Sequence, residues 1–380
     1  MSNIVNILNK VHYPIKIDKY EFKPFEEITI KIDSNSAFRE IRSHRGLRIG
    51  KMNNESYIKR HGLKKGNRIN FVYDNLSQHA GEAYIHAIEA LANPIMKHLP
   101  KDMIGYSKRP LTKMNIRFFN SARINEQGKA PVGPNDVFFS HGIGDKNYWK
   151  GNKIQDYKYV FVPGPAWENR MRNTGYKGEI FICGYTKLDP LINIQKQKES
   201  IKKNSKPKIL WAPTHGYHSN NKGRSSYPAF LRYIDQIPND YDVITSLHPT
   251  SKMHNQKKQL PTTNELLEAD IVIADAGSTL YEAWILEKPV IFPDWICAKD
   301  IMNNFKKDYT NFEYQIYSKQ IGYHAKSMEH MIKLFDIALS DGMRDLENEF
   351  IEDIYPSNIR GKAGEIAAKQ ILDLADRLKI

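Results

Sequence analysis

The segment Asp270–Asp294, DIVIADAGSTLYEAWILEKPVIFPD, combines the residue types that bind a phosphate. An apolar, β-branched run leads into Gly277, Ser278 and Thr279, where a helical pattern begins. The free N–H groups of a helix start, two hydroxyls and the positive end of the helix dipole together favour an anion. Glu282, one turn later, is placed to accept hydrogen bonds from both hydroxyls of a ribose. The alternative is a plain helix cap completed by Glu282, but the KPVIFPD that follows favours a nucleotide site.

Two further strand ends carry side chains suited to the same ligand. In SLHPT (Ser246–Thr250), His248 ends a strand and precedes a proline. Ligands of open parallel sheets bind at the carboxyl ends of strands, where a histidine can donate to a diphosphate as the leaving group develops charge. In WAPTHG (Trp211–Gly216), Thr214 and His215 also follow a strand, and we predict that they bind the donor. The alternative for His248 is a loop histidine held by its turn.

A candidate base lies in the first half of the chain, in FFSHGIGDK (Phe138–Lys146). His141 follows a strand, and Gly142 and Gly144 would let a substrate approach closely. Histidine is the side chain suited to removing a hydroxyl proton near neutral pH. Asp145 is the second candidate, either orienting His141 or acting as the base itself. The alternative is a turn histidine beside glycines.

Neither a metal site nor a cofactor is indicated. Asp275 could bind a metal, but no DxD pair accompanies it. Cys183 and Cys297 belong to no CxxC pair, which argues against a disulfide framework and a structural zinc site. We therefore predict chemistry without a metal and without a cofactor, with a nucleotide-activated donor used as the substrate.

The chain is basic, with a net charge of +13 and a pI near 9.3. Such a charge speaks to partners and not to the fold, and it suits a polyanion or an anionic membrane face. Much of the excess lies between Arg39 and Arg68, and we predict that the acceptor is bound there by Arg42, Arg45, Arg48 and Lys51. The alternative is a solvated, lysine-rich surface.

Short apolar strands alternate with helical patterns, which is typical of an α/β fold with parallel sheets. The first 35 residues are predicted to form an added hairpin. The predicted strands are Arg68–Tyr73, Asn115–Phe119, Asp136–Ser140, Tyr159–Val162, Glu179–Cys183, Lys208–Ala212, Asp242–Leu247, Asp270–Ala274 and Pro289–Phe292. Helices are predicted at Gly81–Leu99, kinked by Pro94, and at Gly361–Ile380, whose apolar stripe should pack against the rest of the chain.

A polar stretch at Gln195–Lys206 is a candidate linker between two halves of this kind. We predict an N-terminal, acceptor-side Rossmann-like domain over residues 1–190 and a nucleotide-donor Rossmann-like domain over 191–360. The last helix, 361–380, is predicted to pack back across both domains. No run approaches the roughly 20 apolar residues of a membrane span, so we expect a cytoplasmic protein, with at most peripheral contact at the inner membrane face.

The order of the motifs HGIGDK, GYTKLD, WAPTHG, LHP, GSTLYE and RGKAGE resembles the CDP-glycerol glycerophosphotransferase family, which builds wall teichoic acids and related polymers. The resemblance covers roughly Asp136–Ile380. It implies a GT-B fold, with two Rossmann-like domains across a cleft. It also implies that His141 is the acceptor-side base, that His248 contacts the donor pyrophosphate, and that Ser278 and Thr279 lie at the donor phosphate.

The sequence departs from that family at three places. HGIGDK lacks the Thr-Pro-Leu core, WAPTHG lacks the Trp-Arg pair, and DAGSTLYEA is closer to the Ser/Thr–Glu signature of nucleotide-sugar transferases and of UDP-N-acetylglucosamine 2-epimerase. A sugar donor is therefore as plausible as CDP-glycerol.

These observations predict a metal-independent GT-B transferase. It would move a sugar or glycerophosphate from a UDP- or CDP-linked donor to a hydroxyl of an anionic acceptor, such as a teichoic-acid or capsule-type polymer. Three alternatives stay open: a phage-type DNA glycosyltransferase that modifies hydroxymethylated bases, a UDP-sugar 2-epimerase-like enzyme, and a non-enzymatic polyanion-binding protein on a degenerate scaffold.

Overall fold

A computed structural model describes residues 68–72, 81–107, 113–118, 132–140, 142–145, 153–198, 206–214, 224–248 and 262–380. Several sequence predictions lie outside these residues. They are the N-terminal hairpin, the two histidines His141 and His215, and the basic residues Arg42, Arg45, Arg48 and Lys51.

The first sheet contains six parallel strands in the order β2-β1-β3-β4-β5-β6. The strands are β1 (Ile69–Val72), β2 (Ile104–Ser107), β3 (Met114–Arg117), β4 (Asp136–Phe139), β5 (Tyr159–Val162) and β6 (Glu179–Ile182). Most are buried because helices cover the sheet, and such strands read as continuous apolar runs. Its helical elements are α4 (Gly81–Met96), η4 (Lys153–Asp156), α5 (Pro165–Asn173) and η5 (Thr186–Leu188).

A polar row crosses this otherwise apolar sheet near the amino ends of its strands. Asn70 lies opposite Asn115, and Asn115 lies opposite Asp136. The Asn70 amide donates to Asn115 at 2.9 Å, and the Asn115 amide donates to Asp136 at 2.8 Å. Arg117 completes the row with a buried ion pair to Asp136 at 3.0 Å. Paired groups of this kind fix the register of the strands, because a slip would leave a buried charge alone.

The second sheet contains five parallel strands in the order β11-β10-β9-β7-β8. They are β7 (Lys208–Trp211), β8 (Asp242–Thr245), β9 (Ile271–Ile273), β10 (Val290–Pro293) and β11 (Tyr323–Ala325). The surrounding helical elements are η6 (Ala229–Gln236), α7 (Thr263–Glu268), α8 (Ser278–Ile285), α9 (Asp294–Phe305), α10 (Phe312–Ser318), α11 (Met328–Asp341) and α12 (Asp345–Ile354).

The strand order reverses between β7 and β9. After β7 the chain moves outward to β8, and after β8 it returns to the other side of β7 to build β9, β10 and β11. The connections that leave β7 and β9 therefore run in opposite directions. Such a switch point opens a crevice at the carboxyl ends of the two strands, and ligands of open α/β sheets bind there.

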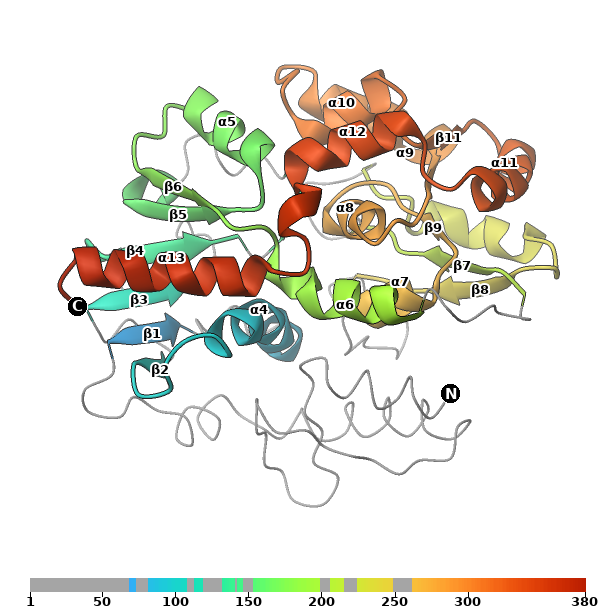
Figure 1. The fold of residues 1–380 in the computed structure, drawn as a ribbon. Helices are drawn as coiled ribbons and strands as arrows, with labels where there is room; N and C mark the ends of the chain where they lie inside the picture. Colours follow the sequence, from blue (N-terminus) through green and yellow to red (C-terminus); the bar gives the residue numbers. More distant parts are fainter. Residues whose placement is uncertain are drawn as a thin grey trace, which may run out of the picture.

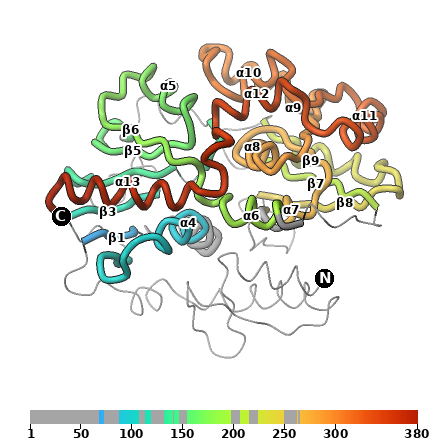
Figure 2. Tube along the Cα trace, in the orientation of Figure 1, coloured from blue at the N-terminus to red at the C-terminus, as the bar shows by residue number. Residues whose placement is uncertain are grey.

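The two sheet domains lie side by side, and the chain passes from one to the other twice (Figures 1 and 2). The first crossing is α6 (Asp189–Lys198), and the second is the stretch that contains η7 (Ser357–Ile359) and leads into α13 (Ala363–Arg377). The domain boundaries predicted at residues 190 and 360 fall at the start of α6 and shortly before α13.

Helix α13 returns to the first domain and lies beside α4, as its apolar stripe predicts (Figure 1). The stripe is buried, and the two helices approach closely at Gly364. A Cβ atom on Gly364 would lie 2.3 Å from the carbonyl oxygen of Pro94. Among the described residues, none of the helices combines the length with the apolar character that crossing a membrane requires.

Candidate functional site

The predicted phosphate-binding residues form a sharp turn at the carboxyl end of β9. Gly277 has a φ of 88°, a left-handed conformation that favours glycine, and Ser278 opens α8. A Cβ atom on Gly277 would lie 3.1 Å from the Thr214 hydroxyl oxygen. Ser278 and Thr279 are partly exposed, whereas Gly277 is buried. We call residues 277–279 the phosphate turn.

A buried carboxylate, Asp275, organises this edge of the sheet. Its Oδ1 accepts the Thr214 N–H at 2.8 Å, and its Oδ2 accepts the Ser226 hydroxyl at 2.8 Å and the Ser226 N–H at 2.5 Å. Burial raises the pKa of Asp275, and these N–H donors oppose the rise. The carboxylate thus ties the end of β7 to the end of β9. Both oxygens of the Asp275 carboxylate accept hydrogen bonds from N–H or O–H groups, so this side chain has a structural role beside the phosphate turn.

Two more polar side chains belong to the same edge. His248 follows β8, which pairs with β7 in parallel, and the histidine is half-buried. Arg224 lies just before η6 and is half-buried, with its guanidinium 5.1 Å from the centre of the Phe305 ring. Within the described part of the chain its buried Nε makes no hydrogen bond. The adjacent Ser225 and Ser226 bond to Thr214 and Asp275, so this half-buried cation belongs to the same edge, where a positive charge favours an anion.

The loop after β4 packs directly onto the phosphate turn. The N–H of Gly144 donates to the Ser278 hydroxyl at 3.3 Å. A Cβ atom on Gly142 would lie 2.6 Å from Ser278 Oγ, and one on Gly144 would lie 2.8 Å from the Gly277 carbonyl carbon. The sequence suggested that these glycines leave room for a substrate. In the structure they leave room for the phosphate turn of the other domain.

Asp145 lies at the centre of a buried ion-pair network between the domains. Its Oδ2 accepts from Arg170 Nε at 2.6 Å, and Arg170 also pairs with Asp308 at 2.7 Å. The N–H of Phe312 donates to the same carboxylate at 3.2 Å. Asp145 is only 1% exposed, so the geometry favours a role in joining the domains over proton transfer. The assignment of His141 as the base stays a prediction.

Glu282, predicted to bind a ribose, faces the first domain. It is 2% exposed, and its Oε1 accepts from Lys187 Nζ at 2.7 Å. The Tyr185 hydroxyl donates to the same oxygen at 3.4 Å. A ribose could reach this carboxylate only where the pair with Lys187 opens, so the ribose role stays a prediction. Lys187 was not singled out from the sequence, although it lies within the GYTKLD motif.

The GYTKLD motif meets the RGKAGE motif, a contact that the sequence did not reveal. Gly184 has a φ of +91°, and a Cβ atom there would lie 2.5 Å from the Tyr355 ring and 2.8 Å from the Ala363 side chain. The Asp189 carboxylate accepts the N–H groups of Ala363 at 3.1 Å and Gly364 at 2.7 Å. It thereby caps α13, as a carboxylate at a helix start does.

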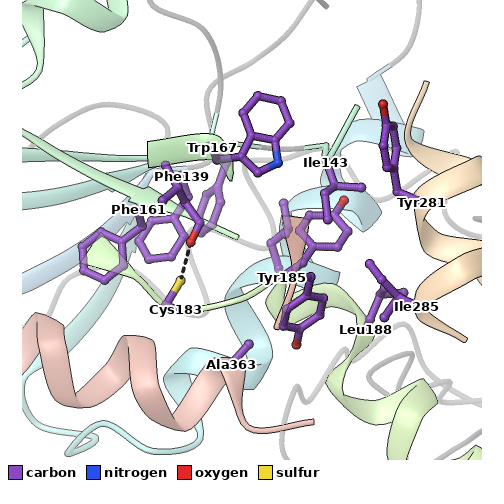
Figure 3. Close-up of a cluster of buried hydrophobic side chains, with 14 of the residues drawn as sticks. Phe139, Ile143, Phe161, Trp167, Cys183, Tyr185, Leu188, Tyr281, Ile285 and Ala363 are labelled. Carbon is purple, nitrogen blue, oxygen red and sulfur yellow. Dashed lines mark hydrogen bonds between the residues drawn. The ribbon is translucent and has the colours of Figure 1, made fainter. Parts of the chain in front are cut away.

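An apolar cluster lies behind these polar contacts and joins the domains (Figure 3). Ile143, from the loop after β4, lies with Tyr185 and Leu188 of the first domain and with Tyr281 and Ile285 of α8. Ile143 is fully buried. The loop after β4 is therefore held on one side by apolar packing and on the other by the phosphate turn.

Two residues that sequence reasoning did not single out, Arg170 and Glu313, hold this junction together. Glu313 accepts the Asp145 N–H at 3.2 Å. Each is a single charged residue in a short helix, and neither belongs to a motif with a spacing that signals a site. Over the residues that the structure describes, no group of three or more His, Cys, Asp or Glu side chains gathers as metal ligands would.

No protein-family model and no curated protein matches this sequence. Solved structures do share its fold. The wall teichoic acid polymerase TagF superposes with a TM-score of 0.55 at 14% identity, over 91% of this chain and 96% of that one. A variant of TagF soaked with CDPG gives 0.52 at 13% identity, over 91% and 96% of the two chains. UDP-GlcNAc 2-epimerase from Neisseria meningitidis, bound to UDP-GlcNAc, gives 0.46 at 13% identity, over 80% and 100%.

The two parallel sheets and the likeness to the two TagF structures confirm the predicted fold class. The chain has an α/β, GT-B-type architecture of two Rossmann-like domains.

Proposed function

We propose that this protein is a GT-B-type transferase that binds a nucleoside-diphosphate-linked donor at the phosphate turn. The observation that carries the proposal is the position of this turn. It combines a left-handed glycine, two partly exposed hydroxyls and a helix start at the carboxyl end of β9, beside the point where the strand order reverses. Each of these features favours a phosphate, and their coincidence is what a donor site needs.

The chemistry follows from the groups at this edge. The oxygen of an acceptor hydroxyl attacks the donor and its proton passes to a base, for which His141 is our candidate. With a sugar donor, the anomeric C–O bond breaks and the nucleoside diphosphate leaves. With CDP-glycerol, the P–O bond between the two phosphates breaks and CMP leaves. Ser278, Thr279 and His248, together with the α8 start, stabilise the departing negative charge, and Arg224 adds a cation to that set.

CDP-glycerol is the first donor to test, because the order of motifs resembles the glycerophosphotransferase family and two TagF structures share the fold. UDP-linked sugars come second, because GSTLYE resembles the signature of nucleotide-sugar transferases. We propose an anionic polymer with free hydroxyls as the acceptor. The basic segment from Arg39 to Arg68 supports this choice by its charge.

The donor site is tested by calorimetry with CDP, UDP and GDP. We expect one of them to bind the parent protein, and we expect Ser278→Ala combined with Thr279→Ala to weaken its binding at least tenfold, since two charge-assisted hydrogen bonds are lost. Ser340→Ala is the control, because Ser340 is exposed on α11. Equal affinity in the parent and the double variant would show that the donor binds elsewhere.

The acceptor is tested separately. Arg42, Arg45, Arg48 and Lys51 are replaced together by Glu, and retention of duplex DNA and sedimentation with anionic vesicles are compared with those of the parent. A polymer transferase working at a membrane should lose sedimentation, whereas a DNA-modifying enzyme should lose retention of DNA. An unchanged result in both assays would assign the basic segment to an ordinary solvated surface.

A further inference from the structure

One carboxyl group, that of Glu313, lies where the two domains meet at the phosphate turn. Glu313 is the second residue of α10, whose start is capped by the Asn311 side chain. It is only 2% exposed. Its Oε1 accepts the N–H of Asp145, a residue of the first domain, at 3.2 Å. Its Oε2 is buried and makes no hydrogen bond among the described residues.

Three consecutive residues of the second domain hold Asp145 by all of its polar groups. The Asn311 amide donates to the Asp145 carbonyl at 3.2 Å, and the Phe312 N–H donates to its carboxylate at 3.2 Å. Glu313 takes the remaining group, the Asp145 N–H. The loop after β4 is therefore fixed in position and orientation relative to α10.

The same carboxyl also faces the phosphate turn. The Gly277 N–H is among the groups that lower the pKa of the Glu313 carboxyl, and the Asp145 N–H that Glu313 accepts directly follows Gly144, whose N–H donates to Ser278 of the phosphate turn. The Tyr281 hydroxyl, one turn into α8, lies close to the carboxyl as well, and burial together with the charge of Glu313 raises the pKa of Tyr281 far above its usual value. One carboxyl thus meets groups from the loop after β4 and from the phosphate turn, which come from different domains.

We propose that Glu313 is a positioning residue of the donor site, which holds the phosphate turn against the loop after β4 and sets the charge that a bound diphosphate meets there. This inference rests on the proposed function, because it takes the phosphate turn to be the donor site. A neutral Glu313 carboxyl still accepts the Asp145 N–H across the domain junction but does not repel an anionic ligand. The same carboxyl in its ionised form places a negative charge beside the donor phosphates.

The surroundings favour the neutral form. Burial raises the pKa of the Glu313 carboxyl, and the negative charge of Asp145 raises it further, while the surrounding N–H groups lower it. The other charged groups near it are Arg170 of α5, which is taken up by Asp145 and Asp308, and Arg224, which faces Glu313 from the loop before η6. Because the pKa is raised, the neutral form dominates at lower pH, and the charge develops as the pH rises through the alkaline range.

The pH dependence of donor binding tests this role. The dissociation constant of the nucleoside diphosphate that binds in the screen above is measured from pH 7 to pH 9, a range that lies at least about one unit above the second phosphate pKa, near 6. In the parent protein we expect affinity to fall about tenfold toward pH 9. A neighbouring like charge shifts a pKa by roughly one unit, and one unit corresponds to a tenfold change in the binding constant. In Glu313→Gln, which keeps the acceptor for the Asp145 N–H but cannot ionise, affinity should stay level.

Glu347→Gln is the matched control. Glu347 is also fully buried with a raised pKa, caused first by burial, but it caps α12, where its carboxylate accepts hydrogen bonds from Arg344. This variant should keep the pH dependence of the parent. The inference fails if Glu313→Gln shows the same fall in affinity as the parent, or if it is folded and binds no nucleotide at any pH. If the parent binds no nucleotide at all, the proposed donor site fails first and this inference fails with it.

Discussion

At the residue scale, the site consists of a locally encoded part and a part assembled by the fold. The phosphate turn is local: Gly277, Ser278 and Thr279 are consecutive, so their spacing alone predicted a helix start that suits an anion. The contacts of Asp145 with Glu313 and Arg170 join residues far apart in the chain. Single charged residues carry no spacing signal, and such contacts follow only from the packing of the two domains.

Asp189 predicts a measurable pH dependence of stability. Burial raises the pKa of Asp189 to about 6, although the hydrogen bonds from the Gly364 and Ala363 N–H groups lower it. A raised carboxyl pKa gives stability that is full below the unfolded value, near 3.8, and is lost as the pH rises through about 6. We expect the difference in free energy of unfolding between the parent and Asp189→Asn to shrink by about 2 kcal/mol from pH 4 to pH 8. Urea titrations at both pH values measure it; a constant difference would contradict the prediction.

Gly144 predicts a steric effect at the domain junction. In Gly144→Ala the new Cβ would lie within 2.8 Å of the Gly277 backbone, which cannot move aside as a flexible side chain can. We expect the free energy of unfolding to fall by about 2 kcal/mol, together with weaker nucleotide binding. Gly175→Ala is the control: it strains a left-handed backbone but meets no atom within 4 Å, so it should leave nucleotide affinity unchanged. If Gly144→Ala binds nucleotide as tightly as the parent, the domain junction can shift to accommodate the added methyl group.

At the scale of elements, the sequence predicted nine strands and both long helices close to their observed positions. Strands such as Lys208–Trp211 are short apolar runs bounded by prolines or other turn residues, which is the signal of a buried parallel strand. The sequence analysis did not predict β2 and β11, because IGYS and YHA are short and mix glycine, serine and histidine with aromatic residues. Their strand conformation comes from pairing with β1 and β10, which are already in place.

The link between η5 and α8 can be tested by a double-mutant cycle. Lys187→Met leaves the buried Glu282 carboxylate without its cation, so we expect a loss of about 3 kcal/mol in the free energy of unfolding. Lys187→Met combined with Glu282→Gln removes both charges and should recover more than half of that loss. Denaturant unfolding of the parent, both single variants and the double variant gives the coupling energy. Additive losses would mean that the two side chains do not interact in solution.

At the scale of the whole molecule, one core cluster of the described residues is shared by both domains, whereas a second cluster lies within the second domain. Apolar residues of both domains form a single cluster that includes Ile143, Leu188 and Ile285. The alternation of strands and helices predicted two α/β units, but not this continuity, because Ile143 and Leu188, which contact α8, lie in short connecting segments. The contact of the GYTKLD motif with RGKAGE likewise depends on the return of α13 to the first domain.

The shared core predicts that both domains unfold together. In scanning calorimetry we expect one transition whose calorimetric and van 't Hoff enthalpies agree, as in a cooperative unit. Ile143→Ala removes a fully buried side chain from the junction and should destabilise that unit by about 3 kcal/mol. Two separate transitions in the parent would show that the domains are thermally independent in spite of the cluster.

The capping of α13 by Asp189 has a consequence for how this architecture can be altered. The carboxylate fastens the point where the chain leaves the first domain to the point where it comes back. Topologically, the second domain is thus an insertion whose two ends are held together by a pair of hydrogen bonds. Inserted units with adjacent ends are tolerated by their hosts, so a different folded unit could be inserted between Asp189 and Ala363 with the first domain kept intact.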